Sequence, residues 1–251
     1  MSHPEQQKFV ELVKNLNISK VNSSRVLEIG SSDVFGSIRK LFPECSDYIG
    51  IDLTPGPGVD IVLNAHDLSQ LDGRFDLALC CEVLEHDPRW DVTVKNILEV
   101  LKPDGFLILT CATSGRPEHG TRRTNPAESP GSQAIGWDHY SNVGEQEFID
   151  CIKSIDAEYG VFTWTNPRIF DLYALVFHQK IDQFKIVVPT SFQMDSIIRS
   201  TPLAYQAARW PIRIIIKLFG ITIGEKFGRY WWIALTKRKK LIRGTRRETK
   251  V

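Results

Sequence analysis

Two acidic side chains occupy positions from which they could hold a nucleoside. Glu28 lies two residues before Gly30 in the segment RVLEIGSSDVFG (residues 25–36), and Asp52 follows a second apolar run, 22 residues after Gly30. Glycine and serine at a sharp turn from a strand into a helix let the backbone approach a ligand closely. An acid at the end of the next strand can accept hydrogen bonds from both hydroxyls of a ribose. These residues predict a nucleoside pocket at the carboxyl edge of a parallel sheet.

The spacing of the glycines indicates which kind of nucleoside fits. A dinucleotide site requires G-x-G-x-x-G, so that a helix N-terminus can hold a pyrophosphate. Here Ser32 occupies the second glycine position, and the next glycine is Gly36. Glu28 would repel a phosphate, but it could bind an ammonium group. At this point the chain resembles the class I S-adenosylmethionine (SAM) dependent methyltransferases, in which the strand ending in E-x-G holds the methionine moiety and the acid after the second strand holds the ribose.

The order of the following segments extends this resemblance over about residues 25–180. FDLALCCEVLEH (residues 75–86) matches the fourth strand of the family, and TVKNILEVLKPDGFLILTCA (residues 93–112) matches a helix, a turn and the fifth strand. In the family an acid and a small residue follow the third strand and contact the adenine amine. Asn64 and Ala65 stand there, and the Asn64 side-chain carbonyl can accept the same hydrogen bond. The resemblance therefore implies SAM as the cofactor and the following residues as its binding site: Glu28, Gly30, Ser31, Ser32, Asp52, Leu53, Asn64, Ala65 and Glu82.

Alternating strand and helix patterns predict an α/β fold with a doubly wound, mostly parallel sheet. A helix is expected over about residues 5–16, followed by alternating strands and helices up to residue 112. The resemblance implies seven strands, of which the last two, near residues 159–165 and 171–178, form an antiparallel hairpin at the edge of the sheet. We place a methyltransferase domain at residues 1–180 and a basic, aromatic-rich C-terminal extension at residues 181–251.

Three titratable side chains are candidates for catalysis. Methyl transfer needs in-line approach of the nucleophile, and a hydroxyl nucleophile must also lose its proton to a base. His139, in GWDHYSN, follows a long loop that could fold over the pocket, with Asp138 beside it, and His86 ends the EVLEH segment. The alternatives are that His139 only orders the loop and that His86 packs beside the cofactor. His119, in the same loop, is expected to be exposed to solvent.

No metal site is expected from the sequence. Some sugar and catechol methyltransferases bind a divalent ion through converging carboxylates, but adjacent acids on one loop are absent here. The cysteines show no C-x-x-C spacing, and three of them lie in apolar strands. They are therefore expected to be buried thiols in a reducing compartment: Cys45, Cys80, Cys81, Cys111 and Cys151.

The long loop at residues 113–142 is where acceptor choice is expected to reside. Its aromatic side chains offer flat faces to a sugar ring, and its arginines suit a phosphate or carboxylate: Trp137, Tyr140, Arg116, Arg122 and Arg123. The loop resembles that of small methyltransferases found with polysaccharide and natural-product biosynthesis enzymes. We therefore expect methyl transfer to a hydroxyl of a small-molecule or glycan acceptor. The alternatives are an N- or C-methyltransferase acting on a lipid or quinone-like acceptor, and a SAM-binding subunit without turnover that is recruited by its basic tail.

The composition is that of a soluble globular protein, but the charge is divided unevenly. The chain has 251 residues, 42% of them hydrophobic, and a net charge of +1. Residues 199–251 carry 14 lysines and arginines against 2 acids, which leaves a charge of −11 on residues 1–198. No stretch of about 20 residues is apolar and free of charge, so a transmembrane helix is not expected.

Basic residues flanking Trp and Tyr are typical of a segment that lies on an anionic membrane surface. Residues 201–251 are therefore expected to make peripheral membrane contact, which would suit a lipid-linked glycan. Docking on the acidic domain and an oligomer contact are the alternatives. Pro211 and Gly220 predict a division of this segment into short helices. Nucleic-acid binding is not expected because no recognisable module accompanies the basic run. The first residues lack a secretory signal, so a cytoplasmic location, peripheral to the inner membrane surface, is expected.

Overall fold

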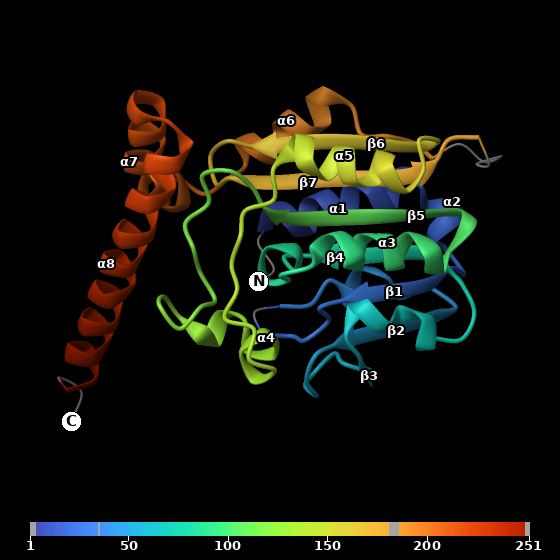
Figure 1. Cartoon of the computed structure of the whole chain (residues 1–251), viewed down its shortest axis with the longest axis horizontal. Helices are drawn as coiled ribbons and strands as arrows, with labels where there is room; N and C mark the ends of the chain where they lie inside the picture. Colours follow the sequence, from blue (N-terminus) through green and yellow to red (C-terminus); the bar gives the residue numbers. More distant parts are fainter. Residues whose placement is uncertain (1–3, 35, 181–185, 249–251) are drawn as a thin grey trace.

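The computed structural model of the chain describes residues 4–34, 36–180 and 186–248, with side chains as far as Leu235. Its centre is a seven-stranded sheet of order β3-β2-β1-β4-β5-β7-β6 (Figure 1). The strands from β3 to β5 are parallel, and β7 runs antiparallel to both β5 and β6. This topology confirms the expected fold class and the C-terminal hairpin. The strands are β1 (Arg25–Ile29), β2 (Asp47–Asp52), β3 (Ile61–Val62), β4 (Phe75–Cys81), β5 (Leu101–Ala112), β6 (Tyr159–Asn166) and β7 (Asp171–His178).

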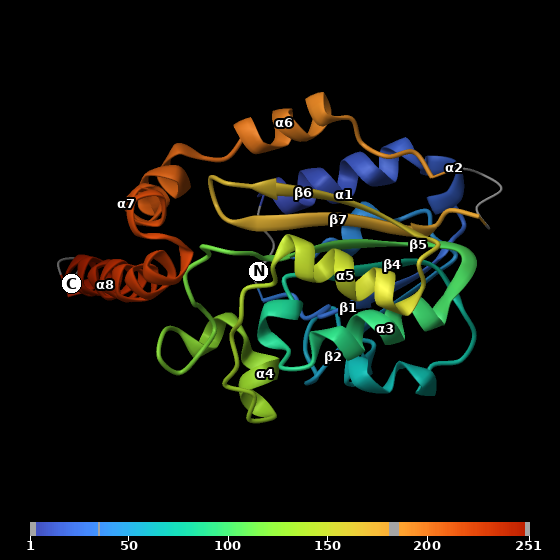
Figure 2. The ribbon, with the colours of Figure 1, turned by 45° about the horizontal axis from the view of Figure 1, so that its top comes forward.

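Helices cover both faces of the sheet because its central strands are apolar on both sides. In β1, Leu27 packs into the cluster with α3 (Trp90–Val100) and α5 (Glu145–Ile155), whereas its neighbour Val26 packs into the cluster with α1 (Pro4–Leu16). Figure 2 shows α1 and α6 (Ser191–Arg199) on one side of the sheet, and α3 and α5 on the other. The short helix α2 (Ile18–Val21) follows α1.

The connection between β1 and β2 differs from the expected helix. Among its described residues, a 3-10 turn at Arg39–Leu41 is the only helical segment. The Asp33 carboxylate accepts a hydrogen bond from the Gly36 backbone at 2.8 Å, so the chain turns here instead of starting a helix. Pro43 then prevents the pattern from continuing as a helix. A second 3-10 segment, Ala65–Gln70, fills the connection between β3 and β4.

Two long helices end the chain, α7 (Leu203–Phe219) and α8 (Ile221–Glu248). The predicted break at Gly220 is present, but the predicted break at Pro211 is wrong, because α7 continues through this residue. Loss of one backbone donor is tolerated where the helix is held by packing, and the next residue, Ile212, is fully buried. The basic run at residues 237–247 lies outside the described side chains.

The α7–α8 hairpin is attached to the rest of the molecule through the long loop after β5. Helix α8 returns along α7, and Trp231 Nε1 donates a hydrogen bond to the Ala208 carbonyl at 2.8 Å. Glu225 of α8 accepts a hydrogen bond from the Gly115 backbone at 2.9 Å, and Arg229 pairs with Glu118 at 2.6 Å. None of the helices within the described residues is both long enough and apolar enough to cross a membrane.

Candidate active site

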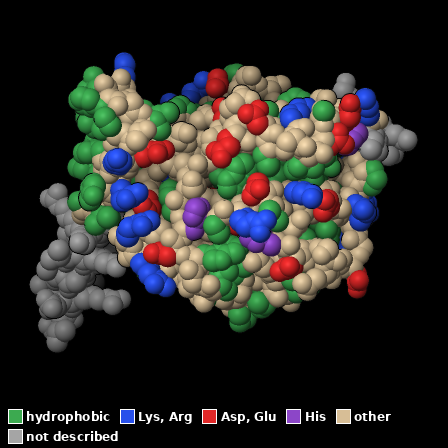
Figure 3. All heavy atoms as spheres, viewed as in Figure 1, with side chains coloured by type: hydrophobic (Ala, Val, Ile, Leu, Met, Phe, Trp, Pro, Cys, Tyr) green, Lys and Arg blue, Asp and Glu red, His purple; other side chains and the backbone are tan. Residues whose placement is uncertain are grey.

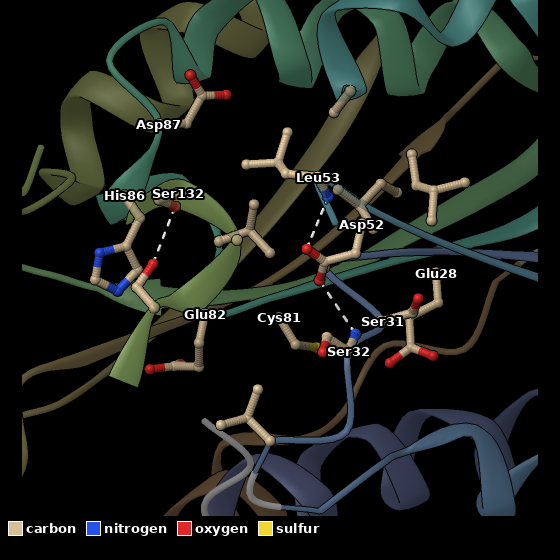
Figure 4. Close-up of a pocket in the computed structure, with 18 of the residues that line it drawn as sticks. Glu28, Ser31, Ser32, Asp52, Leu53, Cys81, Glu82, His86, Asp87 and Ser132 are labelled. Carbon is tan, nitrogen blue, oxygen red and sulfur yellow. Dashed lines mark hydrogen bonds between the residues drawn. The ribbon is translucent and has the colours of Figure 1, made fainter. Parts of the chain in front are cut away.

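A hollow of about 1040 Å³, counting the space at its open mouth, lies at the carboxyl ends of β1, β2 and β4. Residues from these strand ends form one side, and residues of the long loop form the other. All of the residues predicted to bind the cofactor line this hollow (Figure 4): Glu28, Gly30, Ser31, Ser32, Asp52, Leu53, Asn64, Ala65 and Glu82.

Asp52 presents its carboxylate at the centre of this wall. Its two oxygens accept hydrogen bonds from the backbone N–H groups of Ser32, at 3.1 Å, and Leu53, at 2.7 Å (Figure 4). Burial raises the pKa of Asp52, while these backbone donors act in the opposite direction. The two bonds join the loop after β1 to the end of β2 and fix the direction in which the carboxylate points.

Gly30 lets the loop after β1 pass close to the segment after β4. Its φ is +73°, a conformation that side chains disfavour. A Cβ atom at this position would lie 2.4 Å from Val83 Cγ2. The backbone N–H groups of Gly30 and Ser31 both donate to the Ile51 carbonyl, at 2.9 and 3.0 Å, so the turn is held against β2. This close approach explains why glycine is required here.

Glu28 lies at the end of the hollow formed by β1, and its side chain is withdrawn from water. The Tyr48 hydroxyl donates a hydrogen bond to Glu28 Oε2 at 2.7 Å. Burial raises the pKa of Glu28 to about 8. The carboxyl is therefore poised to bind a positively charged group, which would favour its ionised form.

Asn64 and Trp137 form the opposite end of the hollow. Asn64 Oδ1 accepts a hydrogen bond from the His66 backbone at 2.9 Å, and its second lone pair remains available to a ligand. The Trp137 ring lies 5.2 Å from the His66 ring, whose Nε2 is 3.0 Å from the Asp87 carboxylate. These contacts hold an amide oxygen and a flat aromatic face at the same end of the pocket.

The long loop closes over the Asp52 wall, as its position in the sequence predicted. The loop contains the short helix α4 (Pro130–Ala134), and Ser129, Gly131 and Ser132 line the hollow. A Cβ atom on Gly131 would lie 2.6 Å from Asp52 Oδ1. Sequence reasoning did not identify these three residues. The only local signal was the small-residue segment SPGS, which is also typical of ordinary turns.

Two of the three arginines that were predicted to bind an anionic acceptor form ion pairs within the protein. Arg116 is buried, pairs with Asp171 and lies 3.9 Å from the Glu82 carboxylate. Arg123 pairs with Glu118 at 2.8 Å. Arg122 is exposed, so contact of this arginine with an acceptor stays a prediction.

The candidate catalytic residues differ in whether they line the hollow, although the His139 backbone is hydrogen-bonded to the His86 side chain. His86 lines the hollow, whereas His139 and Asp138 are not among the described residues that line it. The Asp138 carboxylate accepts hydrogen bonds from the Arg122 backbone at 2.8 Å and from Gln133 Nε2 at 3.3 Å. The first of these bonds lowers the pKa of Asp138. The catalytic roles of these three residues stay predictions.

His119, which was expected to be exposed, is buried beside His86. Their ring centroids are 5.0 Å apart, and the Tyr140 ring lies 4.9 Å from His119 and 5.6 Å from His86. Burial lowers the pKa of His86 to about 3 and lowers the pKa of His119 well below its usual value, so both rings are neutral at pH 7. The expectation was wrong because the loop folds inward at this point and does not extend into solvent.

Comparisons with known proteins give results that agree with this geometry. A family model described as a methyltransferase domain matches residues 3–151. A curated highly reducing polyketide synthase, AFT9-1 from Alternaria alternata, is 29% identical over 89 residues, which are 36% of this chain but only 3% of that protein.

Solved structures of methyltransferases are similar in fold. An S-adenosylmethionine-dependent methyltransferase from Clostridium acetobutylicum ATCC 824 aligns with a TM-score of 0.51 at 10% identity, over 70% of this chain and 92% of that chain. The N-methyltransferase NodS from Bradyrhizobium japonicum WM9, solved with S-adenosylhomocysteine, aligns with a TM-score of 0.47 at 16% identity, over 71% of this chain and 90% of that chain. The family model covers more than half of the chain, and the sheet order and the strand-end hollow agree with it. The chain therefore belongs to the methyltransferase domain family, and within it to the class I SAM-dependent methyltransferases.

Proposed function

We propose that this protein transfers the methyl group of SAM to a hydroxyl oxygen of a small-molecule or glycan acceptor, lipid-linked glycans included. The observation that carries the proposal is the pair of acidic side chains, Glu28 and Asp52, at the ends of neighbouring strands in one hollow. SAM carries an ammonium group and a ribose diol, and these are the groups that two such carboxyls can bind.

The order of groups along the hollow suggests how SAM lies in it. The methionine end would contact Glu28 and Gly30, the ribose would contact Asp52, and the adenine would lie between Asn64 and Trp137. Strand β4 neighbours β1 on the side away from β2. The methyl group and the acceptor would therefore lie toward the residues that follow β4.

The polar character of that end supports a hydroxyl-bearing acceptor over a lipid or quinone. Glu82 and His86 line it from the β4 side, and Ser129 and Ser132, joined by a 2.9 Å hydrogen bond, line it from the loop (Figure 4). Such groups can orient the hydroxyls of a sugar. We keep His139 as a candidate proton acceptor that movement of the loop would bring toward the hollow.

The test combines SAM binding with methyl transfer. Asp52→Asn should weaken SAM binding by roughly 10- to 100-fold, because each hydrogen bond to a charged acceptor contributes about 1.5–3 kcal/mol. Calorimetry measures the affinity, and mass spectrometry detects methylated products from a panel of sugars and glycosides. Asp72→Asn, at an exposed loop position, is the matched control. Equal affinity of the Asp52→Asn variant and the control would contradict the assignment of the ribose.

We also propose that the α7–α8 hairpin contacts an anionic membrane surface. Basic side chains such as Lys217 and Lys226 lie close in sequence to large apolar side chains that are exposed. Figure 3 shows hydrophobic side chains gathered over this hairpin, at the left edge of the view. The exposed residues are Leu203, Trp210, Leu218, Phe219, Ile221, Ile223 and Tyr230. This combination is typical of segments that lie in a membrane interface.

A further inference from the structure

Three side chains with metal-binding atoms meet beside the hollow. Glu85 and His86 belong to the 3-10 turn after β4, and His119 comes from the long loop. One ligand atom from each residue lies within 4.8 Å of the other two, and His119 Nε2 is 4.0 Å from Glu85 Oε1. All three residues are buried, and His86 is also part of the wall of the hollow.

Three polar atoms of this cluster lack a hydrogen-bond partner in the described part of the chain. Both carboxylate oxygens of Glu85 and the Nδ1 atom of His86 are buried without a hydrogen bond. Glu85 is 0% exposed. Burying a carboxyl group without a hydrogen-bond partner is unfavourable, because the group loses its hydration. A ligand that binds these atoms directly would remove that cost.

The surroundings fix the two imidazole rings in an orientation that suits ligation. His119 Nδ1 lies 3.3 Å from the Pro117 carbonyl oxygen, so Nδ1 is the donor and Nε2 carries the lone pair. A histidine that ligates a metal is commonly held in this way through its other nitrogen. The Tyr140 ring packs against both imidazoles and holds them in place.

The charge around the cluster favours a cation. The buried carboxyl groups of Glu82, Glu85 and Asp171 lie near two buried guanidinium groups, that of Arg116, which pairs with Asp171, and that of Arg209, which lies close to Arg116. A divalent ion would balance the remaining negative charge.

We propose that Glu85, His86 and His119 bind a divalent transition-metal ion at the acceptor end of the hollow. Two imidazole nitrogens and one carboxylate oxygen form a donor set typical of Zn²⁺, Mn²⁺ or Fe²⁺. Three protein ligands also leave coordination positions open. No metal site was expected from the sequence because adjacent acids on one loop are absent. The proposed ligands are instead far apart in the chain, since His119 lies 33 residues beyond His86.

The role of the ion rests on the proposed function, because the acceptor hydroxyl would bind at the open coordination position of the metal. A metal-bound hydroxyl loses its proton more readily, and here the proton passes to water at the open mouth of the hollow. The oxygen then forms a bond to the methyl carbon, and the electron pair of the breaking carbon–sulfur bond stays on sulfur. His86 would thus act as a metal ligand and not as the base.

The experiment measures metal binding by the purified full chain after treatment with a chelator. Titration with Zn²⁺ and with Mn²⁺ by calorimetry, together with elemental analysis, should show one ion per chain. Glu85→Gln and His119→Gln should each weaken metal binding at least tenfold. Removing a group that only supports a metal ligand already lowers metal affinity by roughly this factor. His178→Gln is the matched control, because this histidine lies at the end of β7 beside Asp156, 3.5 Å away. The control should bind as the unaltered chain does.

Two further measurements keep the outcomes separate. SAM affinity is measured on the metal-free samples. If these samples bind metal but not SAM, the proposed function is contradicted and the metal site is not. The absorption spectrum of bound Co²⁺ reports the coordination geometry of the site, and it should change in His119→Gln even if Glu85→Gln does not fold. Absence of binding at micromolar metal, or equal binding by His119→Gln and His178→Gln, would overturn the metal site.

Discussion

At the scale of single residues, Glu28 shows how burial prepares a side chain for one kind of ligand. Its carboxyl accepts a hydrogen bond from Tyr48, and burial raises its pKa to about 8. Near pH 7 most of the folded molecules therefore carry a proton on this group. The ammonium group of SAM, placed beside it, would favour the ionised form, so binding would release that proton.

This coupling predicts that SAM affinity rises with pH. Between pH 6 and pH 8 the cost of removing the proton from Glu28 falls, so the affinity should increase roughly tenfold or more. Calorimetry in two buffers with different heats of ionisation should detect the released proton. Glu28→Gln should bind SAM more weakly and without this pH dependence, and Glu11→Gln, at an exposed position on α1, is the control. A similar pH dependence in Glu28→Gln would exclude Glu28 as the group that releases the proton.

The raised pKa of Glu28 also affects the free energy of unfolding in the absence of ligand. Between pH 4.5 and about 8 the folded chain holds a proton on Glu28 that the unfolded chain has lost. The contribution of this group to the free energy of unfolding therefore decreases as the pH rises through that window. Thermal unfolding of Glu28→Gln should show a weaker decrease over this range.

At the scale of elements, the position of α4 decides how much room remains above Asp52. The helix comes from a loop far along the chain, yet its Gly131 approaches the Asp52 carboxylate so closely that a side chain would overlap it. The loop also carries His119 inward and is joined to α8 through Glu225 and Arg229. One connection thus forms part of the wall of the hollow, contributes His119 to the proposed metal site and attaches the C-terminal hairpin.

Filling the space at Gly131 should impair binding without unfolding the protein. Gly131→Val would push α4 or the Asp52 side chain from its place at a cost of about 1–3 kcal/mol. The expected result is a roughly tenfold loss of affinity for S-adenosylhomocysteine, measured by calorimetry, with a similar melting temperature. Ala134→Val, at the exposed end of the same helix, should bind normally. Unchanged affinity in Gly131→Val would mean that the loop stands away from the pocket in solution.

At the scale of the whole molecule, the division of charge coincides with the arrangement in space. The acidic part of the chain contains the sheet and the hollow, and the basic C-terminal part includes the α7–α8 hairpin, which projects at one end (Figure 1). Trp210 and Phe219 on this hairpin are 59% and 58% exposed. Apolar side chains beside basic ones favour contact with anionic lipid through both burial and attraction.

Vesicle sedimentation tests this arrangement. The full chain should sediment with anionic vesicles and less so with neutral ones, and added salt should weaken the binding. Replacing Trp210 and Phe219 together by alanine should reduce binding severalfold, because two large apolar side chains no longer enter the interface. Phe192→Ala is the control, because this phenylalanine of α6 is even more exposed, at 77%. Failure of the unaltered chain to sediment would rule out membrane contact.

The fold class and the strand-end residues that line the hollow could be predicted from the amino-acid sequence, because both depend on short-range patterns. Alternating apolar strands, the turn at Gly30 and the acids that end β1 and β2 are local features, and a parallel sheet brings its strand ends to one edge. The boundary near residue 180 stays a prediction. On its far side, Met194 and Ile197 of α6 pack into the same cluster as α1.

Contacts between side chains that are far apart in the chain could not be predicted in this way. The buried contact of Glu85 and His86 with His119, the approach of Gly131 to Asp52 and the internal pairing of Arg116 all depend on the path of the long loop. That path is set by packing between segments far apart in the chain, which local periodicity does not encode. The same reason explains the continuation of α7 through Pro211, because burial of Ile212 is a property of the assembled hairpin.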